Sequence, residues 1–122
     1  MSKINSFEDL KVWQLARMLS KDIYLITQKD RFSKDFSLKD QINRSAGSTM
    51  DNIAEGFDRS SDADFSRFLY MSLGSASEVK SMIHLAERLN YIDMLVKDDL
   101  LLKSDEVSKI IRGLIKSLKP KN

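Results

Sequence analysis

Residue types that often carry chemistry are scarce in this chain. Its 122 residues include no cysteine and a single histidine, His84, so disulfides and thiolate metal sites are excluded. One imidazole without a cysteine or a nucleophile elbow does not make a Ser-His-Asp or Cys-His arrangement. A di-metal carboxylate centre needs two Glu-x-x-His pairs, whereas Ser81 stands three residues before His84. We therefore expect no metal, no cofactor and no enzymatic activity.

Helix breakers and long apolar runs are also rare. There are four glycines and one proline, Pro120, and this scarcity favours long helices. No apolar run approaches the roughly 18 residues of a membrane span, and the N-terminus lacks the apolar core of a signal peptide. We expect a cytoplasmic protein without membrane contact. The net charge is only +2, so nucleic-acid binding would depend on how the charge is distributed.

The hydrophobic pattern predicts four amphipathic helices. Apolar residues recur at helical spacing over residues 7–28, 38–56, 63–90 and 99–118, and no segment alternates as a strand does. The connections are short, and a chain of this length fits a single domain. We therefore predict one all-α domain over residues 1–122, an antiparallel up-down-up-down four-helix bundle.

Polar residues and glycine mark the expected helix ends. Ser37 is the predicted N-cap of the second helix, and Gly56 is its predicted C′ residue. Ser61 or the aspartate after it can cap the third helix, which should end at about Asn90. The start of the fourth helix is less sharply defined, because Asp98 or Asp99 can open it and a second start follows a few residues later.

The second and third helices carry small residues in their middles. The segment Ser45–Thr49, with Gly47 at its centre, consists of residues with small side chains. The segment Gly74–Ser77 has side chains of similar size. A glycine in a helix interior costs about 0.5–1 kcal/mol against alanine, so we expect a packing reason for both glycines. Small side chains let two helices approach closely inside the bundle. The alternative is a contact between this face and another subunit.

Charged residues lie beside these small segments. Glu55 and Glu78 fall on stripes that we expect to be partly buried, and Arg44 and Arg67 share the same two helices. Buried carboxylates need charged or hydrogen-bonded partners. We predict that these four residues, with Asn52, form a polar lock between the helices or cap the turn after the second helix. General acid–base catalysis is the less favoured alternative.

The C-terminal segment has the clearest charge bias. No acidic residue follows Glu106, and four of the five cations after it have i, i+3, i+7, i+10 spacing, which places them on one helix face. Such cations complement a helix C-terminus and aid solubility, but the same face can bind phosphates. The candidate nucleic-acid-binding residues are Lys109, Arg112, Lys116, Lys119 and Lys121.

Several motifs occur in a characteristic order. Asp51–Phe57 reads Asp-Asn-Ile-Ala-Glu-Gly-Phe, and Leu73–Glu78 reads Leu-Gly-Ser-Ala-Ser-Glu. The other matching blocks are Phe7–Gln14, Asp40–Ala46, Phe65–Tyr70 and Gly113–Leu118. In these motifs the chain resembles the bacterial four-helix proteins encoded within intervening sequences of 23S ribosomal RNA genes. It departs from them at Thr49–Asp51, which lacks the proline usual before the asparagine.

The resemblance implies a four-helix bundle that forms a ring-shaped homo-oligomer, typically a pentamer, without enzymatic activity. It also implies a likeness to accessory proteins of diversity-generating retroelements, basic barrels that bind nucleic acid and a reverse transcriptase. Our first hypothesis is a non-enzymatic homo-oligomeric accessory protein that binds structured RNA or DNA with little sequence specificity. The alternative is an oligomeric scaffold that binds a protein partner and no nucleic acid. An enzyme is the least favoured third hypothesis.

Overall fold

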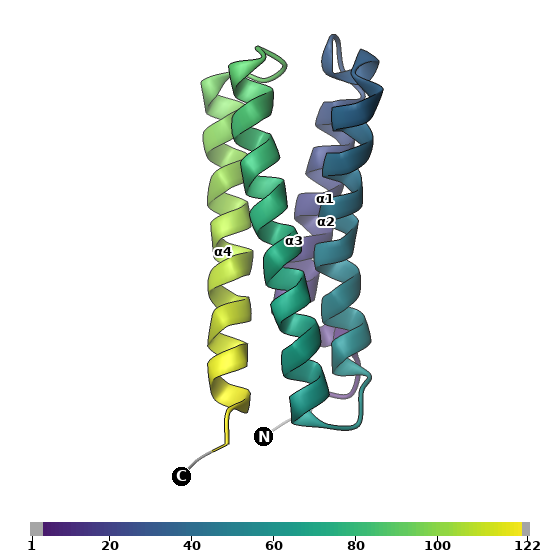
Figure 1. Ribbon diagram of the computed structural model, residues 1–122, viewed down its shortest axis with the longest axis vertical. Coiled ribbons are helices and arrows are strands. Elements are labelled where there is room, and N and C mark those ends of the chain that lie inside the picture. The colour runs from purple at the N-terminus through teal and green to yellow at the C-terminus, as the bar shows by residue number, and fades with distance from the viewer. Residues whose placement is uncertain (1–3, 121–122) are drawn as a thin grey trace.

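The computed structural model describes residues 4–120 of the chain. Within this range the chain forms four long helices and no strand. The helices are α1 (Lys11–Thr27), α2 (Phe36–Phe57), α3 (Asp62–Arg88) and α4 (Met94–Leu118). Short 3-10 turns, η1 (Phe7–Asp9) and η2 (Phe32–Lys34), precede α1 and α2. The four helices run antiparallel in chain order (Figure 1), which confirms the predicted all-α four-helix bundle.

Each helix packs against two neighbours, so the bundle is closed. α1 and α3 both contact α2 and α4. The α2–α3 connection and the C-terminal end of α4 lie at the same end of the bundle (Figure 1). None of the helices within residues 4–120 is long and apolar enough to cross a membrane.

The core consists of two apolar clusters stacked along the bundle. The fully buried residues of one cluster include Ile23, Ile42 and Ile83. Those of the other cluster include Ile53 and Ile111. Burying each such side chain stabilises the fold by about 1.5–3 kcal/mol. These residues belong to the apolar rows that the sequence predicts, and that agreement explains why the fold class was readable from periodicity.

Three buried polar side chains, Thr49, Ser72 and Ser104, separate the two clusters. Ser72 Oγ donates to the backbone oxygen of Thr49 at 2.6 Å, which joins α3 to α2. Thr49 Oγ1 donates to the backbone oxygen of Ser45, four residues earlier in the same helix. Ser104 Oγ has no hydrogen-bond partner among residues 4–120. Thr49, Ser72 and Ser104 therefore form a polar layer across the core, contributed by α2, α3 and α4.

The helix starts differ from the prediction where an earlier aspartate acts as the cap. α2 begins after Asp35, whose carboxylate accepts from the N–H of Leu38 at 3.0 Å, so Ser37 is not the N-cap. α4 begins after Asp93, which accepts from the N–H of Val96 at 2.8 Å. The predicted start at residue 99 is therefore five residues too late. Ser61 caps α3 as expected, by accepting from Asp64 N–H at 3.1 Å.

Two other helix ends instead make their helices shorter than expected. The first helix was expected from residue 7, but η1 is followed by extended Leu10, and α1 starts only at Lys11. The third helix ends at Arg88, two residues before the expected boundary, and Asn90 then adopts a left-handed backbone with φ 63°. Asparagine tolerates this conformation better than most residues.

Gly56 has a different role from the one that the sequence predicts. α2 continues to Phe57, and no described glycine has a positive φ, so Gly56 is not a left-handed C′ residue. A Cβ on Gly56 would lie only 2.6 Å from Phe68 Cβ of α3. Glycine is required because α2 and α3 approach closely at this point.

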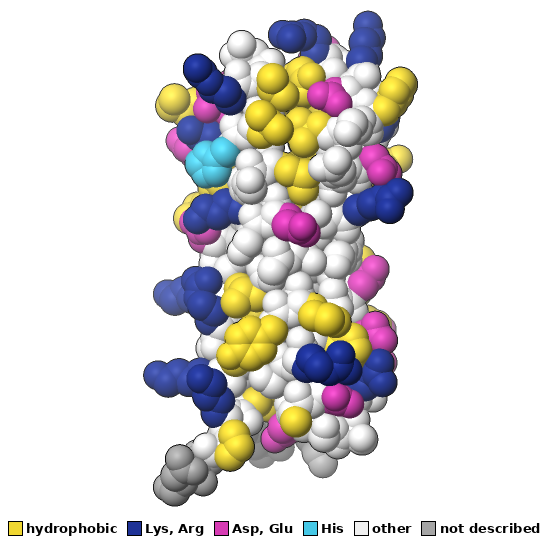
Figure 2. Space-filling view, viewed as in Figure 1, with side chains coloured by type: hydrophobic (Ala, Val, Ile, Leu, Met, Phe, Trp, Pro, Cys, Tyr) yellow, Lys and Arg dark blue, Asp and Glu magenta, His cyan; other side chains and the backbone are white. Residues whose placement is uncertain are grey.

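Gly47 and Gly74 do not mark such an approach. A Cβ added to either glycine would meet no atom within 4 Å among the described residues, and Gly74 is exposed. Close packing inside the bundle is therefore the wrong explanation for these two glycines. Figure 2 shows that the middle of the face over α2 and α3 is mostly white, because few hydrophobic or charged side chains project there. Contact of this face with another subunit stays a prediction.

Candidate nucleic-acid interface

Three of the predicted basic residues meet in one groove between α3 and α4. Arg112 and Lys116 are one turn apart on α4, which places them on one face, and Lys119 is the extended C-cap residue after Leu118. The groove measures about 430 Å³. Its lining consists of Tyr70, Leu73, Arg112, Ile115, Lys116 and Lys119. In Figure 2, dark-blue side chains project at the lower left over α4, beside yellow side chains over α3.

The other two predicted residues do not belong to this groove. Lys109 lines a separate depression with Leu102, Asp105 and Glu106, so the lining of this depression includes two acidic residues. Lys121 lies outside the described residues. The basic surface of α4 is thus smaller than the sequence spacing predicts. The groove of Arg112, Lys116 and Lys119 has no acidic residue of the described chain in its lining, whereas the depression of Lys109 has two.

The three groove cations have no acidic partner in the part of the chain that the structure describes. Within residues 4–120, no carboxylate forms an ion pair with Arg112, Lys116 or Lys119. Neither α3 from residue 65 to 77 nor α4 from residue 107 to 118 contains an acidic residue. Unpaired cations gathered in a groove raise the local positive potential and attract anions. The groove is therefore suited to phosphate groups.

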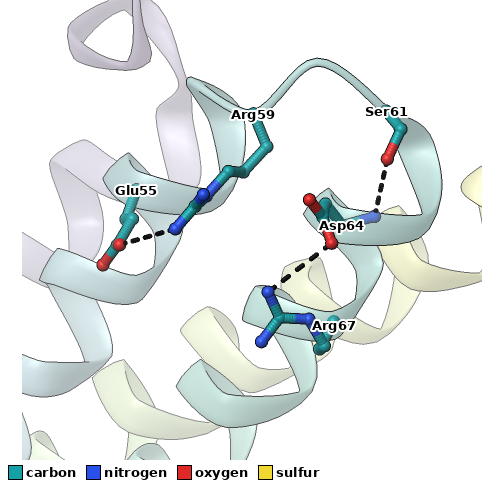
Figure 3. Close-up of polar contacts among 5 residues, drawn as sticks. All are labelled: Glu55, Arg59, Ser61, Asp64 and Arg67. Carbon is teal, nitrogen blue, oxygen red and sulfur yellow. Dashed lines mark hydrogen bonds and ion pairs between the residues drawn. The ribbon is translucent and has the colours of Figure 1, made fainter.

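The arginines at the nearby α2–α3 turn are arranged differently (Figure 3). Arg59 binds Glu55 at 3.0 Å, and Arg67 lies 3.5 Å from Asp64. Both guanidinium groups also cover the ring of Phe68, with carbon-to-centroid distances of 4.7 and 4.6 Å. These arginines have carboxylate partners, so they add less to the positive potential than the α4 cations do.

The predicted polar lock does not form as expected. Glu55 and Glu78 are exposed rather than partly buried. Glu55 and Arg67 pair within their own helix or the adjoining turn, and Arg44 binds Asp40 one turn earlier at 2.9 Å. Only Glu78 reaches the other helix, where it accepts from Ser45 Oγ at 3.4 Å. Helical geometry explains the error, because an arginine and a carboxylate three or four residues apart pair locally.

A smaller polar contact does join the two helices. Ser48 Oγ of α2 and Ser75 Oγ of α3 are 2.9 Å apart. Asn52 Nδ2 donates to the backbone oxygen and to Oγ of Ser48 at 2.9 and 3.0 Å, which orients that hydroxyl. Of the predicted lock, Asn52 therefore takes part in an interhelical network, and its partners are serines rather than charged residues.

The α1–α4 face combines an ion cluster with exposed apolar side chains. Lys103 of α4 binds Asp22 of α1 and Asp99 of α4, both at 2.8 Å. The hydrogen bond to Asp22 raises the pKa of Lys103 most, and the hydrogen bond to Asp99 raises it further. Residues three or four positions apart share a helix face. Met18 and Leu25 flank Asp22 in this way, and Leu95 and Leu102 flank Asp99.

Other surfaces offer less specific chemistry. A groove of about 750 Å³ lies between α1 and α2 and includes Tyr24, Lys39 and Asp40. Its mixed charges favour no single kind of ligand. His84 is exposed on α3. No three histidine, cysteine or carboxylate side chains of residues 4–120 come close enough to hold a metal ion.

Tyr70 is the groove residue that the sequence interpretation missed. It follows the buried pair Phe68 and Leu69, so it lies off the apolar row of α3 and projects outward. An aromatic residue just outside a helix's buried stripe was a usable signal. Its proximity to Arg112 could not be inferred, because it depends on the register between α3 and α4.

Comparison with known proteins agrees with the motifs. Residues 8–113 match the model of a family described as "23S rRNA-intervening sequence protein". No curated protein matches the chain. A similar solved structure is a protein of unknown function from the S23 ribosomal protein family of Bacteroides thetaiotaomicron. It is 28% identical and superposes with a TM-score of 0.79 over 86% of this chain and 98% of its own. The chain therefore belongs to the 23S rRNA-intervening sequence protein family.

Proposed function

We propose that this protein is a non-enzymatic, homo-oligomeric accessory protein of the cytoplasm that binds structured RNA or other nucleic acid with little sequence specificity. The observation that carries the proposal is the groove in which Arg112, Lys116 and Lys119 lie together without an acidic partner among residues 4–120. Phosphate contacts by Lys and Arg position a protein on nucleic acid without reading its sequence.

Self-association is the second part of the proposal. Leu95 and Leu102 are 81% and 72% exposed, and Met18 and Leu25 are about half exposed. Exposed apolar side chains of this size favour burial against another surface. A second copy of the chain is the occupant that we propose, and a pentameric ring is the assembly that the family resemblance implies. Repetition around a ring would multiply the basic grooves and strengthen binding by multivalency.

The nucleic-acid part can be tested with two matched charge removals on the same helix. We expect Lys116→Gln to weaken binding of a fluorescein-labelled RNA hairpin by about 8- to 15-fold at 50 mM salt, the effect of one lost phosphate contact. Lys109→Gln removes an equal charge outside the groove and should change the affinity less than twofold. Fluorescence anisotropy measures both affinities. Failure of the wild-type protein to bind the hairpin at this salt concentration would exclude this part of the proposal.

The assembly part needs its own measurement. Light scattering after size exclusion should give the mass of an oligomer for the wild-type protein and a smaller mass for the double variant Leu95→Ser, Leu102→Ser. Leu85→Ser changes an exposed leucine on α3 and serves as the control, with an unchanged mass. A wild-type protein that elutes as a monomer contradicts the assembly. An oligomer that binds no RNA would favour the alternative, a scaffold for a protein partner.

A further inference from the structure

Tyr70 has a free ring face beside the groove cations. Its side chain is 54% exposed and lines the groove with Arg112, Lys116 and Lys119. Four aromatic rings of the described chain are each covered by a cation. These rings are Trp13, Phe36, Phe68 and Tyr91. Within residues 4–120 the Tyr70 ring takes part in no cation–π contact and no ring–ring contact.

The groove around this ring has an apolar floor and a cationic rim. Leu73 and Ile115 lie under it, from α3 and α4 respectively. Its volume of about 430 Å³ falls in the range of about 300–1,000 Å³ that small-molecule sites occupy. A flat apolar group can rest there while its charged substituents reach the rim. A nucleotide has these two parts, a planar base and a phosphate.

We infer that this groove binds unpaired nucleotides, with a base stacked on Tyr70 and the adjacent phosphates held by Arg112, Lys116 and Lys119. The inference rests on the proposed nucleic-acid binding and adds the class of strand that is bound. Both faces of a base in a duplex are covered by its neighbours, so Tyr70 can stack only where a base is unstacked. Single strands and the loops of structured RNA present such bases.

The spacing of the cations fits a short strand segment. Arg112 and Lys116 are about 6 Å apart along the axis of α4, and Lys119 is the extended residue that follows the helix. The three cations therefore follow one another along the end of α4, as successive phosphates follow one another along a strand. Tyr70 is on the facing helix, so a strand that follows the α4 cations turns its bases toward the ring. Combined stacking and backbone contacts of this type are common where proteins bind single strands.

An abasic strand separates stacking from phosphate binding. We compare a fluorescein-labelled twelve-nucleotide thymidine strand, an abasic strand with the same number of phosphates, and a twelve-base-pair duplex. The wild-type protein should prefer the thymidine strand to the other two probes. Tyr70→Ala should weaken binding of the thymidine strand by about 5- to 150-fold, the usual effect of losing one stacking contact, and leave binding of the abasic strand unchanged.

Two control variants isolate the ring. Tyr70→Phe keeps the stacking surface and should bind within twofold of the wild-type protein. Tyr24→Ala removes a tyrosine that is equally exposed, at 57%, but lies in the groove of mixed charge on the other side of the bundle. It should also leave the affinity unchanged.

The outcomes distinguish the inference from the proposed function. If Tyr70→Ala binds the thymidine strand as tightly as the wild-type protein does, or if the duplex is preferred, the stacking site is refuted while nucleic-acid binding stands. If the wild-type protein binds none of the three probes at low salt, the proposed function fails together with the inference. Equal weakening of the thymidine and abasic strands by Tyr70→Ala also overturns the inference, because the ring then does not contact a base.

Discussion

Replacing Gly56 with alanine should destabilise the bundle, although the same substitution is favourable at most helix positions. The new Cβ would lie 2.6 Å from Phe68 Cβ and 3.1 Å from Phe65 Cδ1. Phe68 Cβ is attached directly to the backbone, so a change of rotamer cannot move it away. The contact is relieved only if α2 and α3 separate, and that movement loosens the apolar cluster on either side of the crossing.

The magnitude follows from two opposing terms. Overpacking a core typically costs about 1–3 kcal/mol, and a contact this short belongs at the upper end of that range. Alanine recovers about 0.5–1 kcal/mol of helix propensity. We therefore expect Gly56→Ala to lower the free energy of unfolding by about 1–2 kcal/mol. Gly47→Ala and Gly74→Ala meet no atom within 4 Å and should raise it by about 0.5–1 kcal/mol each.

Urea denaturation followed by circular dichroism at 222 nm measures these differences. All variants are compared at one protein concentration, because self-association contributes to apparent stability. The m-value should stay constant, so a shift in midpoint reports stability alone. The reasoning is wrong if Gly56→Ala unfolds at the same urea concentration as Gly47→Ala or at a higher one. If Gly74→Ala is stable but assembles less, light scattering will assign Gly74 to a subunit contact.

Three further predictions concern polar groups. Ser104→Ala removes a buried hydroxyl without a partner among the described residues, so the free energy of unfolding should stay constant or rise by up to about 1 kcal/mol. A lower free energy of unfolding in urea denaturation contradicts this. The hydrogen bond from the backbone N–H of Leu38 lowers the pKa of Asp35 most, and the hydrogen bond from the Tyr91 hydroxyl lowers it further. Its stabilising contribution is present above about pH 3.9 and is lost as the pH falls through the folded-state pKa; Asp35→Asn should flatten the acid side of the stability curve. The pKa of Lys103 is raised by Asp22 and Asp99, so its contribution is present below about pH 10.4 and is lost as the pH rises through the folded-state pKa; an alkaline limb unchanged in Lys103→Met would refute this.

The fold was readable from the sequence because its helices bury regular apolar rows. Their exact starts were less accessible, because several aspartates could serve as a cap. Asp93 and Asp99 both precede apolar residues, and only Asp93 lies before a residue with a free helical N–H to offer. Asp99 is instead an exposed helical residue that binds Lys103 at 2.8 Å. Both aspartates have the residue type that N-caps favour, so residue type alone does not choose between them.

The candidate site was only partly predictable for a related reason. Spacing alone places Lys109, Arg112 and Lys116 on one side of α4, but it does not say which of them has acidic neighbours. Asp105 and Glu106 line the same depression as Lys109, whereas no carboxylate of the described residues lines the groove of Arg112 and Lys116. Likewise, Tyr70 faces Arg112 only because of the way α3 packs against α4. Contacts within a helix follow from sequence spacing, whereas contacts between helices depend on their register.

The salt dependence of nucleic-acid affinity tests the central claim most directly, namely that the α4 groove cations bind phosphates. For a single strand, each phosphate contact adds about −0.7 to the slope of log K against log salt. For the wild-type protein we predict a slope of about −2 or steeper. The slope should be less steep by about 0.7 for Lys116→Gln and equal to the wild-type slope for Lys109→Gln. A flat wild-type dependence, or equal losses of slope in the two variants, would contradict the account.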